Sequence, residues 1–338
     1  EMTSSLVGSE MCIRDRHRLA PQAHSFRAYY IKNIPQSCCA FNVYIKAAHE
    51  LCGYLECRKA IRNRLFVIAI AVGCIVTLCS LIPQVKSYYR GIQVVNGFSE
   101  VFQHRNPHAA MNTLYNHWVG GETHTLGSSV YFFIFPLLVA IPYGWSFCNE
   151  HRIGYTRCMV LKTGKFPYYF AKYCAVFLSG GLTMVIPLVF NFLLTAMFVP
   201  AVCPDPSYLI WYAVNGASLM SELYYTYPAV YVLLYLAIDF LFCGLIACLS
   251  YSISTIYKNR VVVVLLPFFL LLGLNFAGVS IVYTSNLIRY TEFSPIYFLH
   301  PAAARYDAGW NVILIEALIL FVLTFVPTVI KGKGNEIY

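Results

Sequence analysis

The sequence predicts an all-helical protein that crosses a membrane six times. Six apolar stretches reach the roughly 20 residues that a helix needs to cross a bilayer. Composition agrees, since 59% of the residues are hydrophobic and 12% are charged, whereas an ordinary soluble domain has about 25% charged residues. The basic residues concentrate on one side of the predicted spans. The six predicted spans are Leu65 to Ile82, Val130 to Cys148, Tyr173 to Val199, Ala229 to Ser250, Val261 to Tyr283 and Val312 to Ile330.

The distribution of Lys and Arg predicts the orientation of these spans. Nineteen of the 24 basic residues precede the first span or lie in loops on the same side, and five lie on the other side. Cytoplasmic loops of membrane proteins carry an excess of Lys and Arg, so we expect both termini in the cytoplasm, in a plasma membrane of the bacterial type. The formal charge of +9 then faces anionic headgroups, and we expect membrane lipids and no nucleic acid as partners.

The region before the first span divides into two parts. Residues 5–16, which read SLVGSEMCIRDR, resemble translated sequencing-adapter sequence and do not enter the fold prediction. We expect residues 1–40 to be a disordered tail that is partly artefactual, and residues 41–64 to form an amphipathic helix on the membrane surface. The six-helix domain then covers residues 65–331, and residues 332–338 form a cytoplasmic tail.

The predicted interfacial helix has an apolar and a polar face. Its basic end directly precedes the first span, where long side chains reach headgroups while their stems stay buried. Such a helix either anchors the first span or transmits motion to it from a cytoplasmic partner, and the pattern leaves both interpretations open. The apolar face holds Tyr44, Ala48, Leu51 and Leu55, whereas Lys46, Glu50, Glu56, Lys59 and Asn63 lie largely elsewhere.

The predicted outer loops hold histidines but no metal motif. Residues 83–127 form the first of these loops and contain four histidines. His104 and His108 have helical spacing, but Pro107 lies between them and no cysteine or close carboxylate pair accompanies them. We therefore expect no metal there. Of the thirteen cysteines, Cys203 alone falls in an outer loop, so we expect no disulfide framework.

The segment between the second and third spans has the pattern of a docking element. A short helix with alternating apolar and basic residues can lie along the inner membrane surface and present one side to a soluble partner. Gly164 is expected to end this helix. Lys172, at the mouth of the third span, is expected to snorkel to the cytoplasmic headgroups. The apolar residues are Ile153, Val160 and Leu161, and the basic residues are Arg152, Arg157 and Lys162.

On these residues the chain resembles the permease subunits of type-2, exporter-class ABC transporters. In that family the loop after the second span reads Glu, a few residues, Gly, a basic or small-residue turn and an aromatic-x-x-Lys entry. The six-span topology, the interfacial helix and the cytoplasmic termini also fit, over about residues 41–331. The long loop at 83–127 and the Phe166-Pro167 pair depart from the pattern and leave substrate and outer gating open. The matching residues are Glu150, Gly154, Gly164, Tyr169 and Lys172.

The resemblance implies a transport subunit without catalysis of its own. In the family this loop, here residues 149–165, is a coupling helix that sits in a groove of a separate ATPase subunit, which binds ATP and magnesium. No stretch matches GxxxxGK[ST], so we expect no P-loop, catalytic residue or cofactor in this chain. A second permease subunit, identical or different, would complete the path for export of an unidentified substrate. The docking residues implied are Glu150, Arg152, Gly154, Arg157, Lys162 and Gly164.

Asp239, in the middle of the fourth span, marks a candidate polar site within the membrane. A carboxylate near a bilayer centre costs about 2.5 to 3.5 kcal/mol on insertion scales. Either it serves a substrate or proton path, or it forms a structural hydrogen bond to Asn191, Asn275 or a hydroxyl group. The alternative function is a proton-coupled secondary transporter using Asp239, although the inverted repeats typical of that class are not visible. A membrane enzyme would need catalytic groups clustered at one depth, and the sequence does not indicate such a cluster.

Overall fold

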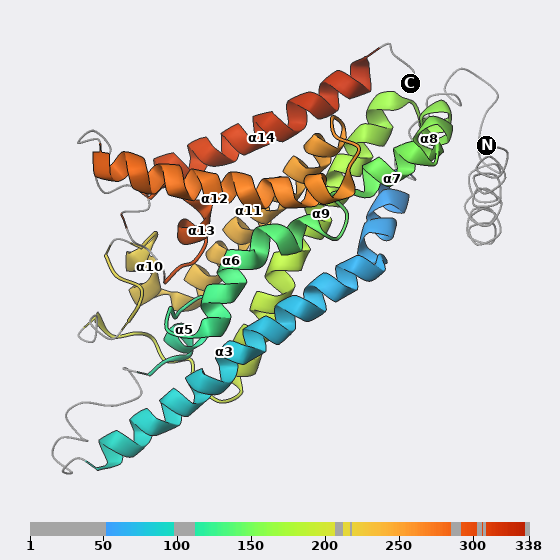
Figure 1. Cartoon of the computed structure of the whole chain (residues 1–338). Helices are drawn as coiled ribbons and strands as arrows, with labels where there is room; N and C mark the ends of the chain where they lie inside the picture. The colour runs from blue at the N-terminus through green and yellow to red at the C-terminus, as the bar shows by residue number, and fades with distance from the viewer. Residues whose placement is uncertain are drawn as a thin grey trace, which may run out of the picture.

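The computed structural model describes residues 52–97, 112–206, 212–216, 218–284, 292–302, 306 and 309–334. This part of the chain folds as a bundle of α-helices (Figure 1). Five of these helices are long and apolar enough to cross a membrane, as expected of an all-helical, polytopic membrane protein. They are α3 (Arg64–Asn96), α9 (Lys165–Ala196), α11 (Pro228–Ser254), α12 (Arg260–Thr284) and α14 (Trp310–Lys333).

The second predicted span is not one continuous helix. The structure has α6 (Leu126–Ala140), a turn at 141–145 and then α7 (Ser146–Arg152). Pro142 has no backbone N–H to continue the helix, and side chains bond the carbonyl groups at the break. Asn63 donates to the Pro142 carbonyl at 2.6 Å, and the Trp145 indole donates to the Ile141 carbonyl at 2.9 Å. α6 has 15 residues and is therefore about 22 Å long, shorter than the five long helices.

α3 continues well beyond the first predicted span. It has 33 residues and is therefore about 50 Å long, so residues 83–96, predicted as the start of an outer loop, are helical. Gln84 in this extension is buried, and its Oε1 lies 2.8 Å from His117 Nδ1. Residues 83–96 are too polar to be predicted from hydropathy as part of a span. They pack against the segment that precedes α6.

The helices α9 and α11 pack closely at the centre of the bundle. Gly180 and Gly181 are packing residues, because a Cβ atom at Gly180 would lie 2.3 Å from the Ala247 Cβ and one at Gly181 would lie 2.6 Å from Phe240 Cδ2. Gly244 on α11 meets α9 in the same way, with Phe177 Cδ2 at 2.7 Å from an added Cβ. Gly273 differs, since nothing lies within 4 Å of a Cβ atom added there. Small residues therefore allow close backbone approach at the α9–α11 contact. Gly127 does the same between α6 and α3, because a Cβ atom there would lie 2.6 Å from the Ser80 backbone nitrogen.

The short helices gather at two ends of the bundle, as Figure 1 shows. The α8 end holds α7 and α8 together with the helix at 52–61, and the α5 end holds three short helices. α12 and α14 leave apolar outer faces exposed, as expected of helices that face lipid. The short helices are α8 (Tyr155–Thr163), α5 (Leu114–His117), α10 (Ser221–Thr226) and α13 (Pro295–Phe298). The exposed apolar side chains include Phe269, Leu270, Leu314, Leu318 and Val322.

Candidate functional site

A group of charged side chains is buried at the α8 end of the bundle. Lys172, in the third turn of α9, is fully buried, and its Nζ lies 3.0 Å from Glu56 Oε2 and 2.7 Å from Glu150 Oε1. Glu56 comes from the helix at 52–61 and is also fully buried, whereas Glu150 comes from α7. Two tyrosines complete the group. The buried charge cluster consists of Glu56, Tyr143, Glu150, Tyr168 and Lys172.

Every proton of the Lys172 ammonium group has an acceptor. Besides the two carboxylates, Nζ donates to Tyr143 Oη at 2.9 Å. Tyr143 in turn donates to Glu56 Oε2 at 2.8 Å, and Tyr168 donates to Glu150 Oε2 at 2.6 Å. A Lys side chain has three donors and no acceptor, so its hydrogen-bonding capacity is fully used. Buried charges are tolerated when they are paired and hydrogen-bonded in this way.

A second cation, Lys59, balances the charge of the cluster. Its Nζ lies 3.1 Å from Glu56 Oε1 and also donates to the hydroxyl of Tyr155 in α8. Burial opposes ionisation of Glu56, but Lys172 and Lys59 outweigh it and lower the pKa of Glu56 to about 2. The carboxylate is therefore ionised at neutral pH. The resulting ion-pair network joins the helix at 52–61 to α7, α8 and α9.

Two predictions about these residues are wrong. Lys172 does not snorkel to headgroups, because its ammonium group is fully buried and lies between the carboxylates of Glu56 and Glu150. Glu56 does not lie on an exposed polar face: Cys52, Glu56 and Ala60 are one turn apart and form the buried face of their helix. The four-residue spacing of Cys52, Glu56 and Ala60 is visible in the sequence. A glutamate is rarely buried without a paired cation, however, and the sequence does not show that Lys172 pairs with Glu56. The predicted helix residues outside the described residues are Tyr44, Lys46, Ala48, Glu50 and Leu51.

α7 and α8 form a helical hairpin on top of the buried charge cluster. Gly154 makes the turn between them with a φ of +78°, and Gly164 ends α8, as predicted, with a φ of +86°. Glycine adopts such backbone angles without steric cost. Glu150, one of the predicted docking residues, instead faces inward and holds the base of the hairpin. The exposed side chains, which together form the hairpin surface, are Arg152, Ile153, Arg157, Cys158, Leu161 and Lys162.

The predicted polar site around Asp239 is not assembled as expected. Asp239 is buried in α11, and its Oδ1 has no hydrogen-bond partner among the residues that the structure describes. The Asn191 side chain instead accepts from the Val119 N–H at 3.0 Å and donates to the Thr77 carbonyl at 2.9 Å. Asn275, on α12, is half-buried. Within the described part of the chain, no hydrogen bond joins Asp239 to either asparagine, so a structural bond to them does not explain the carboxyl group.

Aromatic hydroxyl groups lie between Asp239 and the α5 end. Tyr231 and Tyr235 occupy the two helical turns of α11 before Asp239, and their ring centroids are 4.9 Å apart. The Tyr224 ring lies 5.2 Å from that of Tyr231, so three buried tyrosines follow one another along this path. This row of tyrosines was not among the features predicted from the sequence. The signal was the spacing of four residues from Tyr231 to Tyr235 and from Tyr235 to Asp239.

Buried histidines belong to the structure of the α5 end. His117 bonds to Gln84, and His300 stacks on Phe132 with ring centroids 4.0 Å apart. His300 Nε2 also lies 2.9 Å from the Glu122 carbonyl oxygen. Among the described residues, no group of three or more His, Cys, Asp or Glu side chains could hold a metal ion. Of the other histidines in the predicted outer loop, His124 is exposed, and His104 and His108 lie outside the described residues.

The stability of the protein is expected to fall as the pH decreases from 7 to 5. Burial lowers the pKa of both His117 and His300 to about 4, whereas an exposed histidine titrates near pH 6.5. Between these values the unfolded chain binds protons that the folded chain does not bind. The contribution of the two neutral, buried histidines to the free energy of unfolding is therefore fully present above about pH 6.5. It is lost as the pH falls toward 4.

At pH 5 the expected loss is on the order of 2 kcal/mol for each histidine. The measurement is the unfolding temperature of the purified protein in detergent across this pH range. The His117→Gln variant is expected to lose part of the dependence, because glutamine does not titrate. A variant with the full pH dependence of the wild type would contradict the assignment to His117.

No protein-family model, curated protein or solved structure matches this chain. The function therefore has to be inferred from the residues of the site. Two arrangements have clear mechanical or chemical consequences. One is the exposed hairpin surface that stands on the buried charge cluster, and the other is the buried carboxyl group of Asp239 next to a row of tyrosines.

Proposed function

We propose that this chain is the membrane-spanning permease subunit of an ATP-driven ABC transporter, with export as its direction. The observation that carries the proposal is the connection between the hairpin surface and the membrane helices. Arg152, Arg157 and Lys162 are exposed on the hairpin. Directly beneath them, Glu150 is bonded to Lys172 of α9. A soluble ATPase that binds the hairpin surface would therefore act on residues attached to a long apolar helix.

The ion-pair network gives the hairpin a fixed position relative to two other elements. Lys172 joins α7 to α9, and it also joins both to Glu56 in the helix that directly precedes α3. Lys59 adds a bond from this helix to Tyr155 of α8. Coupling in proteins travels through packed side chains and hydrogen-bond networks of this kind. These contacts support the interpretation in which the helix before the first span transmits motion.

The proposal includes a six-span topology in which α6, the turn at 141–145 and the first residues of α7, up to Cys148, make the second crossing. The excess of basic residues at the α8 end supports a cytoplasmic location for this end and for both termini, in a plasma membrane of the bacterial type. ATP and magnesium would bind to the partner ATPase. A second permease subunit, identical or different, would complete the path for the substrate.

The test is affinity purification of the tagged protein from its native membrane in mild detergent, with quantitative mass spectrometry of copurifying proteins. We expect an ATPase to copurify with the wild type. With the double variant Arg152→Glu/Arg157→Glu, the amount of copurifying ATPase is expected to fall by about tenfold or more, because two attractive contacts become repulsive. The matched control is Lys86→Glu/Arg90→Glu on α3, which reverses two exposed charges outside the hairpin. Equal retention by both double variants, or no ATPase with the wild type, would contradict the proposal.

A proton-coupled secondary transporter is the second candidate, and the unpartnered Oδ1 of Asp239 favours it. A carboxyl group inside a membrane bundle is suited to binding and releasing a proton, and the tyrosines on α11 provide hydroxyl groups beside it. In such a carrier the Asp239→Asn variant would abolish proton-coupled uptake or efflux by vesicles. In the ABC transporter, this variant is expected to leave ATPase copurification unchanged.

A further inference from the structure

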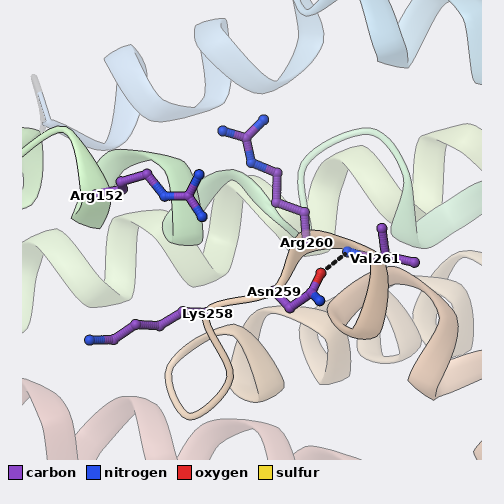
Figure 2. Close-up of a pocket in the computed structure, with 5 residues that line it drawn as sticks. All are labelled: Arg152, Lys258, Asn259, Arg260 and Val261. Atoms are coloured by element: carbon purple, nitrogen blue, oxygen red, sulfur yellow. Dashed lines mark hydrogen bonds between the residues drawn. The ribbon is translucent and has the colours of Figure 1, made fainter.

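A basic pocket lies at the α8 end, on the side where α11 connects to α12. Its volume is about 660 Å³. Figure 2 shows Arg152 reaching from α7 toward the turn that carries Lys258, Asn259 and Arg260. Three of the five lining residues are cations and none is acidic. The lining residues are Arg152, Lys258, Asn259, Arg260 and Val261.

Neighbouring groups hold Arg260 in place at this pocket. Its Nη2 donates to Asn149 Oδ1 at 2.5 Å, and its guanidinium carbon lies 5.0 Å from the Trp145 ring centroid. Asn259 caps the start of α12 by accepting the Val261 N–H at 3.0 Å. The cation is therefore oriented before any ligand binds, which reduces the entropy lost on binding. A planar guanidinium group with free donors is suited to phosphate oxygens.

The electrostatic field around the pocket is positive. Burial lowers the pKa of His151, the residue next to Arg152 in α7, and the charges of Lys258, Arg157 and Lys331 lower it further. The nearest carboxylate on the same helix, Glu150, is bonded to Lys172 and Tyr168 on the other side of α7. An anion at the pocket would therefore meet several cations without a competing carboxylate from α7.

Apolar side chains next to the pocket indicate the kind of anion. Ile256 and Tyr257 are exposed on one side, and Val261 is exposed at the start of α12. Further along α12, Phe269 and Leu270 are exposed on its outer surface. The cations thus lie at the end of an exposed apolar helix. This is the arrangement that a phospholipid requires, with its headgroup at the membrane surface and its acyl chains against the helix.

We propose that this pocket binds the phosphate-bearing headgroup of an anionic phospholipid, with the acyl chains lying along the outer surface of α12. The site is separate from the hairpin surface except for Arg152, which belongs to both. The inference does not depend on an ATPase partner, because it uses only charges and apolar side chains of this chain. Variants of Lys258 and Arg260 test it without altering the proposed ATPase docking residues.

The experiment is native mass spectrometry of the purified protein titrated with phosphatidylglycerol or phosphatidylcholine. We expect tighter binding of phosphatidylglycerol, and we expect affinity to fall about fivefold for each cation removed, in Lys258→Gln and in Lys258→Gln/Arg260→Gln. The matched control, Lys86→Gln/Arg90→Gln, removes two exposed cations from α3 and is expected to keep the affinity. Phosphatidylcholine binding should be the same in all variants.

Three outcomes would overturn the proposal. One is equal phosphatidylglycerol affinity in the wild type and in Lys258→Gln, a variant of one exposed side chain that is expected to fold normally. Another is an equal loss of phosphatidylglycerol affinity in the control Lys86→Gln/Arg90→Gln, which would indicate nonspecific attraction by surface charge. The third is full displacement of phosphatidylglycerol by millimolar inorganic phosphate, which would indicate a site for free phosphate instead of a lipid.

Discussion

Replacing Lys172 with Met is expected to destabilise the protein by about 3–5 kcal/mol, the usual effect of removing one partner from a buried ion pair. The substitution keeps the length of the side chain but removes the charge. Glu56 would then be buried with only Lys59 as a counter-ion, and Glu150 would lose its ammonium partner at 2.7 Å. The measurement is the unfolding temperature in detergent, compared with that of the wild type at the same pH.

A second substitution separates the lost charge pair from lost packing. In Lys172→Met/Glu56→Gln, the fully buried carboxylate that retains only Lys59 as a counter-ion is replaced by a neutral amide, so we expect recovery of more than half of the lost stability. The matched control is Lys162→Met on the exposed surface of α8, which is expected to change stability by less than about 0.5 kcal/mol. If Lys172→Met were as stable as Lys162→Met, the buried charge cluster would not hold the hairpin.

The same variants address the coupling role. Lys172→Met leaves the hairpin surface chemically unchanged. Under the proposed function, this variant is expected to retain a copurifying ATPase at permissive temperature and to lose ATP-dependent transport. Arg152→Glu/Arg157→Glu is expected to lose the ATPase itself. A Lys172→Met protein that is folded and transports at the wild-type rate would argue against transmission through the cluster.

The long helices could be predicted from the sequence because hydropathy is summed over about 20 residues, so single exceptions do not change the result. The interruption after α6 contains Pro142, whose carbonyl accepts a hydrogen bond from the distant Asn63. Prolines also occur inside α3, α9, α12 and α14. Proline alone therefore does not identify a break, and the deciding contact comes from elsewhere in the chain.

The site shows the same division between local and distant contacts. Gly164 was correctly predicted to end α8, because glycine at a helix end is a local signal. The inward position of Glu150 could not be predicted, since it depends on Lys172, 22 residues away, and on Tyr168. Glu56 is 116 residues from Lys172. A single sequence gives no indication that these two charges meet, and each one alone is expected to be exposed.

The second large effect is expected at the close contact between α9 and α11, in the variant Gly180→Val. A Cβ atom at Gly180 would lie 2.3 Å from the Ala247 Cβ and 3.0 Å from the Cys243 carbonyl oxygen. Neither neighbour is the end of a flexible side chain, so the two helices would have to separate. We expect destabilisation of about 3 kcal/mol or more, at the upper end of the range for overpacked sites, seen as a lower unfolding temperature in detergent.

Exchanging the two small residues tests whether this contact is the cause. Gly180→Ala is expected to be destabilising, and Gly180→Ala/Ala247→Gly is expected to recover most of the loss, because the second change removes the nearest atom. Gly273→Val on α12 is the matched control, since nothing lies within 4 Å of an added Cβ there. If Gly180→Val and Gly273→Val had equal effects, the close approach of α9 and α11 would not limit the residue at position 180. If only Gly180→Val destabilises, the central helix pair requires a small residue at position 180 for its packing.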